Sequence, residues 1–267
     1  MSNSAAAARM LRDFRYVLNI HGGISHNGMP GQCTSRMWVK DKIFDRTIGK
    51  ATIKLADEVV SVSKSDVPQI ESTFGVRARY VPNAVSTEKF SPNGNGSRVI
   101  TYVGKLEHWK GAGQLLEIFK KVQEEIRDVR FRIIGNGSLT DMFRRSNIPL
   151  ELTGHVPHEQ MPAFYQDSAI SVLPSYMEGA PTTCMESLAC GVPCVATRVG
   201  DTPEIVSDGK TGFLVEPGDA DASASHLITL LEDESLRRRM GTQGRQHVID
   251  HFSYDKVVEQ MLRVYDG

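Results

Sequence analysis

Residues 99–135 read VITYVGKLEHWKGAGQLLEIFKKVQEEIRDVRFRIIG, and this segment indicates the fold class. Two short runs rich in Val and Ile, at 99–104 and 130–135, flank a segment whose apolar residues recur at helical spacing. One face of that helix carries Leu115, Leu116, Phe119, Val122 and Ile126. The two runs mostly do not alternate apolar with polar residues, which is typical of strands covered on both faces in a parallel sheet. The stretch predicts a strand, a helix and a second parallel strand.

The same pattern continues toward the carboxyl end. Further short apolar runs are LELTG (150–154), AISVLPS (169–175), PCVAT (193–197) and GFLVEP (212–217). Amphipathic segments separate them, and residues 220–266 read as consecutive helices. This alternation of strands and helices predicts an α/β fold with a complete, doubly wound, Rossmann-like parallel sheet.

The first 90 residues carry the same alternation more thinly. A helix-like AAAARMLRDF segment precedes the strand RYVLNI (15–20), and a loop at 21–36 leads to a helix expected from Trp38 to Leu55. Two more strands are expected at 58–62 and 78–82, followed by a Pro-, Asn- and Gly-rich linker at 82–98. We therefore predict a first domain over 1–90, a second over 91–250, and a helix at 251–267 that packs back toward the first domain.

The predicted first domain is small for an independent parallel sheet. Three short strands and two or three helices bury little apolar surface. RYVLNI reads as an interior strand, yet few residues precede it that could cover its other edge. The sequence thus predicts an incomplete Rossmann-like domain, completed either by a partner chain or by a longer protein of which this chain is part.

Composition places the chain among ordinary globular proteins. The 267 residues carry a formal net charge of −1, which gives no electrostatic reason to expect a nucleic acid as partner. The start MSNSAAAARM lacks the features of a secretory signal, and no apolar run reaches the ~18 residues that span a bilayer. The cysteines, Cys33, Cys184, Cys190 and Cys194, lack metal-ligand spacing, and three of them are expected to be buried thiols. We therefore expect a cytoplasmic protein.

Two lysines follow the strand at 99–104. Gly104 allows a tight exit from the strand, and Lys105 and Lys110 place two cations on one loop, just before a predicted helix begins near Gly111. Two ammonium groups beside a helix N-terminus suit a doubly charged anion such as a diphosphate. A pair of solvated lysines on a surface loop is the alternative.

The segment YMEGAPTTCMESLACG (176–191) places Glu178 and Glu186 on either side of a turn made of small residues. Thr182 or Thr183 is expected to cap the following helix, whose free N–H groups could bind a phosphate. The two carboxylates could accept hydrogen bonds from sugar hydroxyls on each side of that phosphate. The alternative is a solvated loop glutamate and a helix glutamate that interacts with the helix dipole.

Two other features are weaker. GNGS (135–138) is a poor dinucleotide fingerprint because Thr140 stands where the third glycine belongs, so a tight turn is the better interpretation and a dehydrogenase is disfavoured. His21 directly follows the strand RYVLNI and could face a cleft, although a single loop histidine is more often structural or solvated.

Taken together, these features resemble the retaining glycosyltransferases with the GT-B architecture, the family typified by sucrose-phosphate synthases and bacterial mannosyltransferases. The resemblance covers nearly the whole chain, and its most specific element is the Glu-x7-Glu pair Glu178 and Glu186 in this order of strands. The matching blocks are IHGG (20–23), ADEVVSVS (56–63), VPNAVSTEKFSP (81–92), YVGKLEHWKG (102–111), FRIIGNGS (131–138), LTGHVPHEQMPAFYQDSAISVLPSYMEG (152–179), MESLACGVPCVAT (185–197) and GDTPEIVSDGKTGFLVEPGD (200–219).

The resemblance implies a role for each matching residue. Lys105 and Lys110 match the basic residues that hold the donor diphosphate, although the first is usually Arg in the family. Glu178 matches the glutamate that contacts the donor sugar, and Glu186 the one that binds the ribose hydroxyls. His21 matches a first-domain histidine that reaches the donor sugar. The remaining implied donor contacts are Gly104, the backbone of Gly154, His155 and Val156 near the base, and that of Ala180, Pro181, Thr182 and Thr183 near phosphate and sugar.

The resemblance also implies the reaction. A hexosyltransferase of this kind moves a sugar from a nucleoside-diphosphate-sugar to an acceptor with retention, and the family generally works without a catalytic metal or other cofactor. The acceptor, whether glycan, lipid or small molecule, is not indicated, and peripheral membrane contact is common among relatives with lipid acceptors. Relatives have a complete first domain, whereas the chain shows only its rear half. A nucleotide-sugar-binding module with little or no transfer activity of its own is therefore the alternative function.

Overall fold

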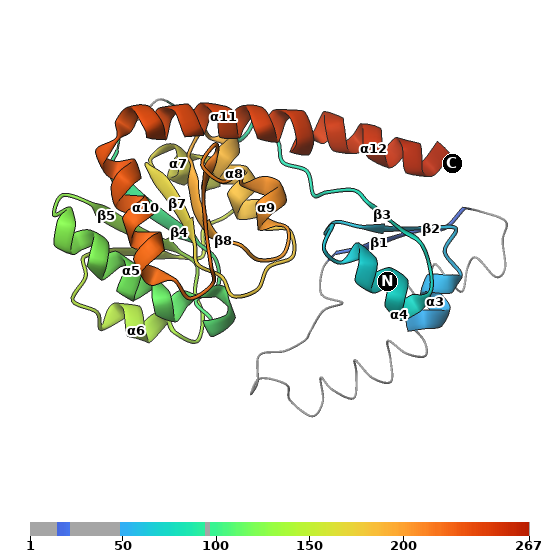
Figure 1. Cartoon of the computed structure of the whole chain (residues 1–267), viewed down its shortest axis with the longest axis horizontal. Helices are drawn as coiled ribbons and strands as arrows, with labels where there is room; N and C mark the ends of the chain where they lie inside the picture. The colour runs from blue at the N-terminus through green and yellow to red at the C-terminus, as the bar shows by residue number, and fades with distance from the viewer. Residues whose placement is uncertain (1–14, 22–48, 94–96, 267) are drawn as a thin grey trace. The chain divides into compact units, whose positions relative to one another are not determined.

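The computed structural model describes residues 15–21, 49–93 and 97–266, and every element below lies in these ranges. The chain divides into two compact units, the first made of Met1–Asn83 and Val258–Gly267 and the second of Ala84–Val257. Figure 1 shows both units, with most of their helices and strands labelled. Each unit is built on a parallel sheet, which agrees with the α/β prediction.

The first unit contains, in its described residues, a three-stranded parallel sheet in the order β1-β2-β3. Its elements are β1 (Val17–Ile20), α3 (Lys50–Lys54), β2 (Glu58–Ser61), α4 (Val67–Phe74) and β3 (Ala78–Tyr80). The small core consists of Ile53, Val59, Ile70, Phe74 and Ala78. The three predicted strands are confirmed.

Two sequence predictions for the first unit are only partly tested by the described residues. RYVLNI is expected to be an interior strand, but β1 pairs only with β2 among the described residues and lies at an edge of the sheet. Within the helix expected from Trp38 to Leu55, α3 covers Lys50–Lys54, and the part before Gly49 lies outside the described residues. The helix expected in AAAARMLRDF also lies outside the described residues.

The second unit contains, in its described residues, a six-stranded parallel sheet in the order β6-β5-β4-β7-β8-β9. The strands are β4 (Val99–Val103), β5 (Arg130–Ile134), β6 (Leu150–Gly154), β7 (Ile170–Leu173), β8 (Cys194–Thr197) and β9 (Gly212–Val215). The chain builds the sheet outward from β4 in one direction, then returns to add β7 on the other side. The predicted doubly wound sheet is confirmed, and its strand order reverses between β4 and β7.

Helices cover both faces of this sheet. They are α5 (Ala112–Glu125), α6 (Thr140–Arg144), α7 (Met161–Gln166), α8 (Thr182–Ala189), α9 (Thr202–Ile205), α10 (Ala220–Glu232) and α11 (Glu234–Phe252), with a short 3-10 helix η2 (His108–Lys110) before α5. The helix α12 (Tyr254–Asp266) follows α11, and its residues from Val258 onward belong to the first unit. The consecutive helices predicted for 220–266 are confirmed. The expected packing of the last helix on the first domain stays a prediction.

The sheet separates two apolar cores. One core joins β4 and β5 to α5 and α10, and it contains Tyr102, Phe119 and Leu227. In Figure 1, α5 and α10 lie side by side over this face. The other core joins β7 and β8 to α7, α8 and α11, and it contains Tyr165 and Leu188. Both faces are therefore fully covered, as the non-alternating strands require.

The second unit begins with residues 84–92, which form a turn at 87–89 and which we call the connecting segment. The Val85 N–H donates to the carbonyl of Phe252 at 2.9 Å, and Phe90 is only 1% exposed within the second core. The Arg245 guanidinium donates to the carbonyls of Phe90 and Thr87 at 3.0 and 3.2 Å. The composition of residues 82–98 indicates a linker, but Val85 and Phe90 within them are part of the core.

Candidate functional site

The loops that follow β4 and β7 lie side by side at the carboxyl edge of the sheet. Tyr176, after β7, donates its N–H to the carbonyl of Trp109, after β4, at 3.0 Å. Ligands of doubly wound folds bind at this edge, where the strand order reverses. The two loops are those that carry the lysines and the first glutamate singled out above.

Gly111 lets these loops pack backbone against backbone. It is the N-cap of α5 and has a φ of 69°, a value that favours glycine. A Cβ at this position would lie 1.8 Å from the carbonyl oxygen of Pro174. The start of α5 thus packs directly against the end of β7. Since α5 begins at Ala112, Lys110 and Gly111 lie where the helix begins, as predicted.

Lys110 and Glu178 form an ion pair across the two loops. The Nζ atom lies 2.6 and 2.8 Å from the two carboxylate oxygens of Glu178. The Ser175 hydroxyl donates to the same carboxylate at 2.6 Å, and the ammonium lies 4.7 Å from the centre of the Trp109 ring. The Glu178 side chain is only 6% exposed and that of Lys110 18%, so water screens the pair weakly.

Lys105 is placed differently from Lys110. Its side chain is exposed, while its carbonyl accepts a hydrogen bond from the Tyr102 hydroxyl at 2.8 Å. Hydrogen bonds from Ser138 lower the pKa of nearby Glu107, and Lys105 lowers it further. The structure brings Lys110, but not Lys105, into contact with Glu178.

Backbone contacts from Gly200 and Asp201 support the turn between Glu178 and α8. Gly200, with a φ of 50°, lies so close that a Cβ there would be 2.2 Å from the Glu178 carbonyl oxygen. The Asp201 N–H also donates to the carbonyl of Gly179 at 2.8 Å. These contacts fix the small-residue turn, in which Gly179 and Ala180 are half-buried.

The start of α8 differs from the prediction. The N-cap is Pro181, whose φ of −70° and ψ of 102° end the preceding turn, and no side chain caps the helix. The expectation that Thr182 or Thr183 provides the cap is wrong, because both already lie in the first turn of the helix. Without a side-chain oxygen in place, the first-turn N–H groups remain suited to an external acceptor.

Glu186 lies one turn farther along α8, in a second hydrogen-bonded cluster. The Tyr165 hydroxyl donates to Oε2 at 3.0 Å, and Nε2 of His158 lies 2.9 Å from Oε1. Tyr165 is fully buried, and burial together with the Glu186 charge raises its pKa well above the usual range, so it stays protonated and donates. The sequence analysis quotes His158 and Tyr165 only within the block LTGHVPHEQMPAFYQDSAISVLPSYMEG (152–179) and gives neither of them a role.

The loops after β5 and β6 complete this edge. Gly154 ends β6 with a φ of 69°, and its carbonyl accepts from the Gly135 N–H at 2.8 Å. His155 is exposed, whereas Val156 packs against the second core. A Cβ at Gly135 would lie 2.0 Å from the carbonyl oxygen of Gly104, so GNGS is the tight turn that the sequence predicts.

His21 belongs to the first unit. It directly follows β1 and is exposed. Its implied contact with a donor sugar stays a prediction.

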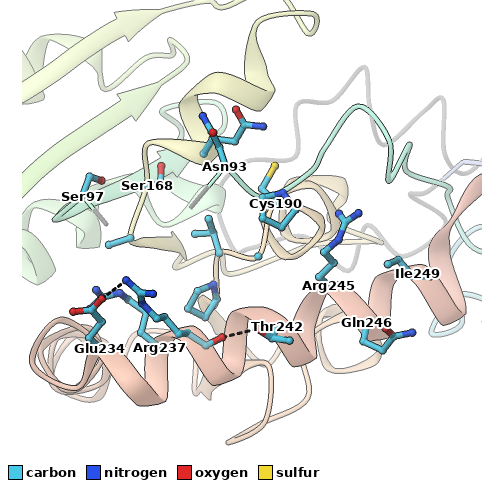
Figure 2. Close-up of a pocket in the computed structure, with 17 residues that line it drawn as sticks. Asn93, Ser97, Ser168, Cys190, Glu234, Arg237, Thr242, Arg245, Gln246 and Ile249 are labelled. Atoms are coloured by element: carbon cyan, nitrogen blue, oxygen red, sulfur yellow. Dashed lines mark hydrogen bonds and ion pairs between the residues drawn. The ribbon is translucent and has the colours of Figure 1, made fainter. Parts of the chain in front are cut away.

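A cavity of 430 Å³ lies elsewhere on the second unit, at the amino-terminal ends of β4, β7 and β8 (Figure 2). Three arginines of α11 line it, but each contacts the chain itself. Arg245 binds backbone carbonyls, Arg237 donates to the carbonyl of Leu230 at 2.7 Å, and Arg238 pairs with Glu234 at 2.5 Å. Arg245 and Arg237 therefore hold α11 against other parts of the unit, whereas Arg238 pairs with a residue of α11 itself.

The described residues lack both a metal-binding cluster and a membrane-spanning helix. Among them, no group of three or more His, Cys, Asp or Glu side chains is arranged to hold a metal ion. Within the same ranges, none of the helices combines the length and apolar character that crossing a bilayer requires. Cys184, Cys190 and Cys194 are buried free thiols, as predicted, and Cys33 lies outside the described residues.

Comparison with known proteins gives a family match. Residues 86–247 match the family model described as glycosyl transferases group 1. An N-acetyl-alpha-D-glucosaminyl L-malate synthase of Bacillus anthracis is 25% identical over 222 residues, which are 82% of this chain and 58% of the relative. A GDP-mannose-dependent alpha-(1-6)-phosphatidylinositol monomannoside mannosyltransferase of Mycolicibacterium smegmatis is 30% identical over 226 residues, which are 74% of this chain and 59% of the relative. The chain thus spans less than two thirds of the length of either relative.

Solved structures show the same fold. A sucrose-phosphate synthase from Thermosynechococcus elongatus superposes with a TM-score of 0.82 at 22% identity, over 99% of this chain and 70% of that one. The Anabaena protein HepE, in complex with UDP and glucose, superposes with a TM-score of 0.77 at 16% identity, over 100% of this chain and 75% of that one. These similarities, together with the two parallel sheets, confirm the predicted GT-B-type architecture.

Proposed function

The chain belongs to the glycosyl transferases group 1 family, and on this premise we propose that it transfers a hexose from a nucleoside-diphosphate-sugar to an acceptor with retention of the anomeric configuration. The observation that carries the proposal is the Lys110–Glu178 ion pair beside the uncapped first turn of α8. The relatives support a nucleotide-sugar donor, since one is named as GDP-mannose-dependent and the HepE structure contains UDP. The chain therefore needs a site for a diphosphate flanked by two sugars.

The residues of the carboxyl edge suit that ligand. Lys110 and the exposed Lys105 supply cations for the diphosphate, joined by the first-turn N–H groups of α8. Glu178, next to Lys110, accepts hydrogen bonds from the donor sugar. Glu186, eight positions later, accepts them from the ribose hydroxyls. The backbone of Gly154, His155 and Val156 lines the base end of the site.

The reaction then breaks one bond and forms another at the anomeric carbon. The bond from that carbon to the diphosphate oxygen breaks, and its electron pair leaves with the diphosphate, whose charge the lysines and the helix N-terminus stabilise. The acceptor hydroxyl oxygen bonds to the same carbon from the same face. Its proton passes to the departing diphosphate oxygen, which lies on that face.

The acceptor side belongs to the first unit. His21, exposed at the end of β1, would approach the donor sugar from this unit. The three described strands of its sheet are compatible with a partner chain, or a longer form of the protein, that supplies further strands. The acceptor remains a glycan, a lipid or a small molecule.

The decisive experiment needs no acceptor. Release of UDP, GDP or ADP from the matching hexose donors into water is measured by a coupled assay, and proton NMR of the released sugar records its anomer. We expect slow release of a single nucleoside diphosphate, with the sugar first appearing in the configuration of the donor. The Lys110→Ala variant should lose this activity, whereas Lys120→Ala, on the exposed face of α5, should keep it.

The outcomes separate the candidate functions. Binding of a nucleoside diphosphate by calorimetry without release of product, in the full chain, would favour the nucleotide-sugar-binding module. Release with inverted configuration would contradict the retaining mechanism. No binding of any of the three nucleotides by folded protein would contradict a donor site in this chain.

A further inference from the structure

His158 connects Glu186 to the connecting segment. Its Nε2 atom lies 2.9 Å from Oε1 of Glu186, and its Nδ1 atom lies 3.1 Å from Nζ of Lys89. The ring also lies against Phe90, with 5.4 Å between ring centres. Lys89, His158 and Glu186 thus form a linear series of hydrogen bonds that starts outside the sheet and ends at the proposed ribose site.

The hydrogen bond with Lys89 defines the tautomer of His158. A lysine ammonium group only donates hydrogen bonds, so Nδ1 has to accept. The neutral imidazole then carries its proton on Nε2 and donates it to Glu186. Lys89 therefore holds His158 in the form that directs an N–H group at the carboxylate.

Glu186 is held from two sides by this arrangement. His158 donates to Oε1 and Tyr165 donates to Oε2 at 3.0 Å, so the carboxylate cannot rotate without losing one of these bonds. The Glu186 side chain is 11% exposed, whereas His158 is 59% exposed. A carboxylate has about four acceptor positions, of which two are used here, leaving about two for a ligand.

We infer that His158 is a positioning residue for the nucleotide: it orients the Glu186 carboxylate so that its remaining acceptor positions meet the 2′ and 3′ hydroxyls of the donor ribose. This inference rests on the proposed function and adds to it a residue that selects ribose over deoxyribose. A site built to accept a hydroxyl hydrogen bond discriminates against the analogue that lacks the hydroxyl, because its acceptor is left unpaired. Loss of the fixed orientation should reduce that discrimination more than it reduces binding of the diphosphate.

The test compares ribonucleotides with their 2′-deoxy forms. Dissociation constants of UDP, GDP and ADP, each beside its 2′-deoxy form, are measured by calorimetry on the full chain and on His158→Ala and His158→Gln. For the nucleotide that binds, we expect the wild type to prefer the ribose form by about tenfold or more. His158→Ala should reduce this preference to about threefold or less, whereas His158→Gln, which retains an N–H donor, should keep most of it.

A purely structural role of His158 would weaken both forms equally and leave their ratio unchanged. If the wild type binds a nucleotide and His158→Ala keeps the full preference, the inference is wrong while the proposed function stands. A wild type that binds both forms equally would also overturn it. If no nucleotide binds to the folded wild type, the proposed function itself fails. Because His158 is exposed, circular dichroism of both variants should match that of the wild type.

Discussion

Lys110 and Glu178 are 68 residues apart in the chain, yet the Lys110 ammonium contacts both oxygens of the Glu178 carboxylate. The contact joins the loops after β4 and β7, which are neighbours only because the strand order reverses between them. In the proposed reaction, the Lys110 ammonium would exchange Glu178 for the diphosphate, and the Glu178 carboxylate would exchange Lys110 for the donor sugar. The pair therefore belongs both to the stability of the fold and to the proposed reaction.

Lys110→Ala should lower the free energy of unfolding by about 2 kcal/mol, because the nearly buried Glu178 carboxylate loses its cation. Glu178→Gln in the same background should restore much of this loss, since the amide carries no charge and can still bond to Ser175. Urea denaturation of the single and double variants measures both effects. Strictly additive losses would show that the two side chains do not depend on each other.

Gly111→Ala should destabilise the protein by about 3 kcal/mol, because the new Cβ would overlap the Pro174 carbonyl oxygen and the φ of 69° disfavours alanine. Gly113→Ala is a matched control two residues later in α5, where a Cβ meets nothing within 4 Å. It should stabilise the protein by about 0.5 kcal/mol, as alanine favours helices. Thermal unfolding of both variants provides the comparison, and equal effects would contradict the close packing of the two loops.

Arg245→Ala should cost about 2 kcal/mol, because the carbonyls of Thr87, Phe90 and Ala189 lose their shared donor. Arg238→Ala on the same helix removes only an exposed pair with Glu234 and should cost less than about 0.5 kcal/mol. Guanidinium denaturation ranks the two variants. A smaller loss for Arg245 than for Arg238 would show that this guanidinium does not anchor the connecting segment.

Stability should fall in alkaline solution, in part through Cys190. Burial, and next the Glu186 charge, raise the pKa of the Cys190 thiol from its ordinary 9.0 to about 12. The folded thiol thus keeps its proton where the unfolded thiol loses it, so its stabilising contribution is complete below pH 9.0 and declines as the pH rises toward about 12.

By pH 10 this one group should reduce the free energy of unfolding by about 1 kcal/mol relative to pH 8. The measurement is urea unfolding at pH 8, 9 and 10, for the wild type and for Cys190→Ala. The variant should show a flatter decline, because alanine does not titrate. Identical curves would mean that other groups account for all of the pH dependence.

The strands and the carboxyl edge could be predicted from sequence because each depends on local pattern. The non-alternating runs such as VITYV identify buried parallel strands, and residues that follow them must lie at one edge. The start of α8 was misjudged because Thr182 is a good N-cap by composition, while the backbone at Pro181 already ends the turn. His158 and Tyr165 were missed because nothing local indicates that a loop histidine and a helix tyrosine meet a glutamate 21 or more residues away.

The anchored connecting segment has a practical consequence for exchanging domains between related enzymes. A cut near residue 90, where the composition suggests a linker, would separate Phe90 from the core that buries it and would leave Arg245 without its acceptors. A chimera joined before Ala84 keeps these contacts together. The part that can be exchanged as a unit therefore includes the connecting segment as well as the sheet and its helices.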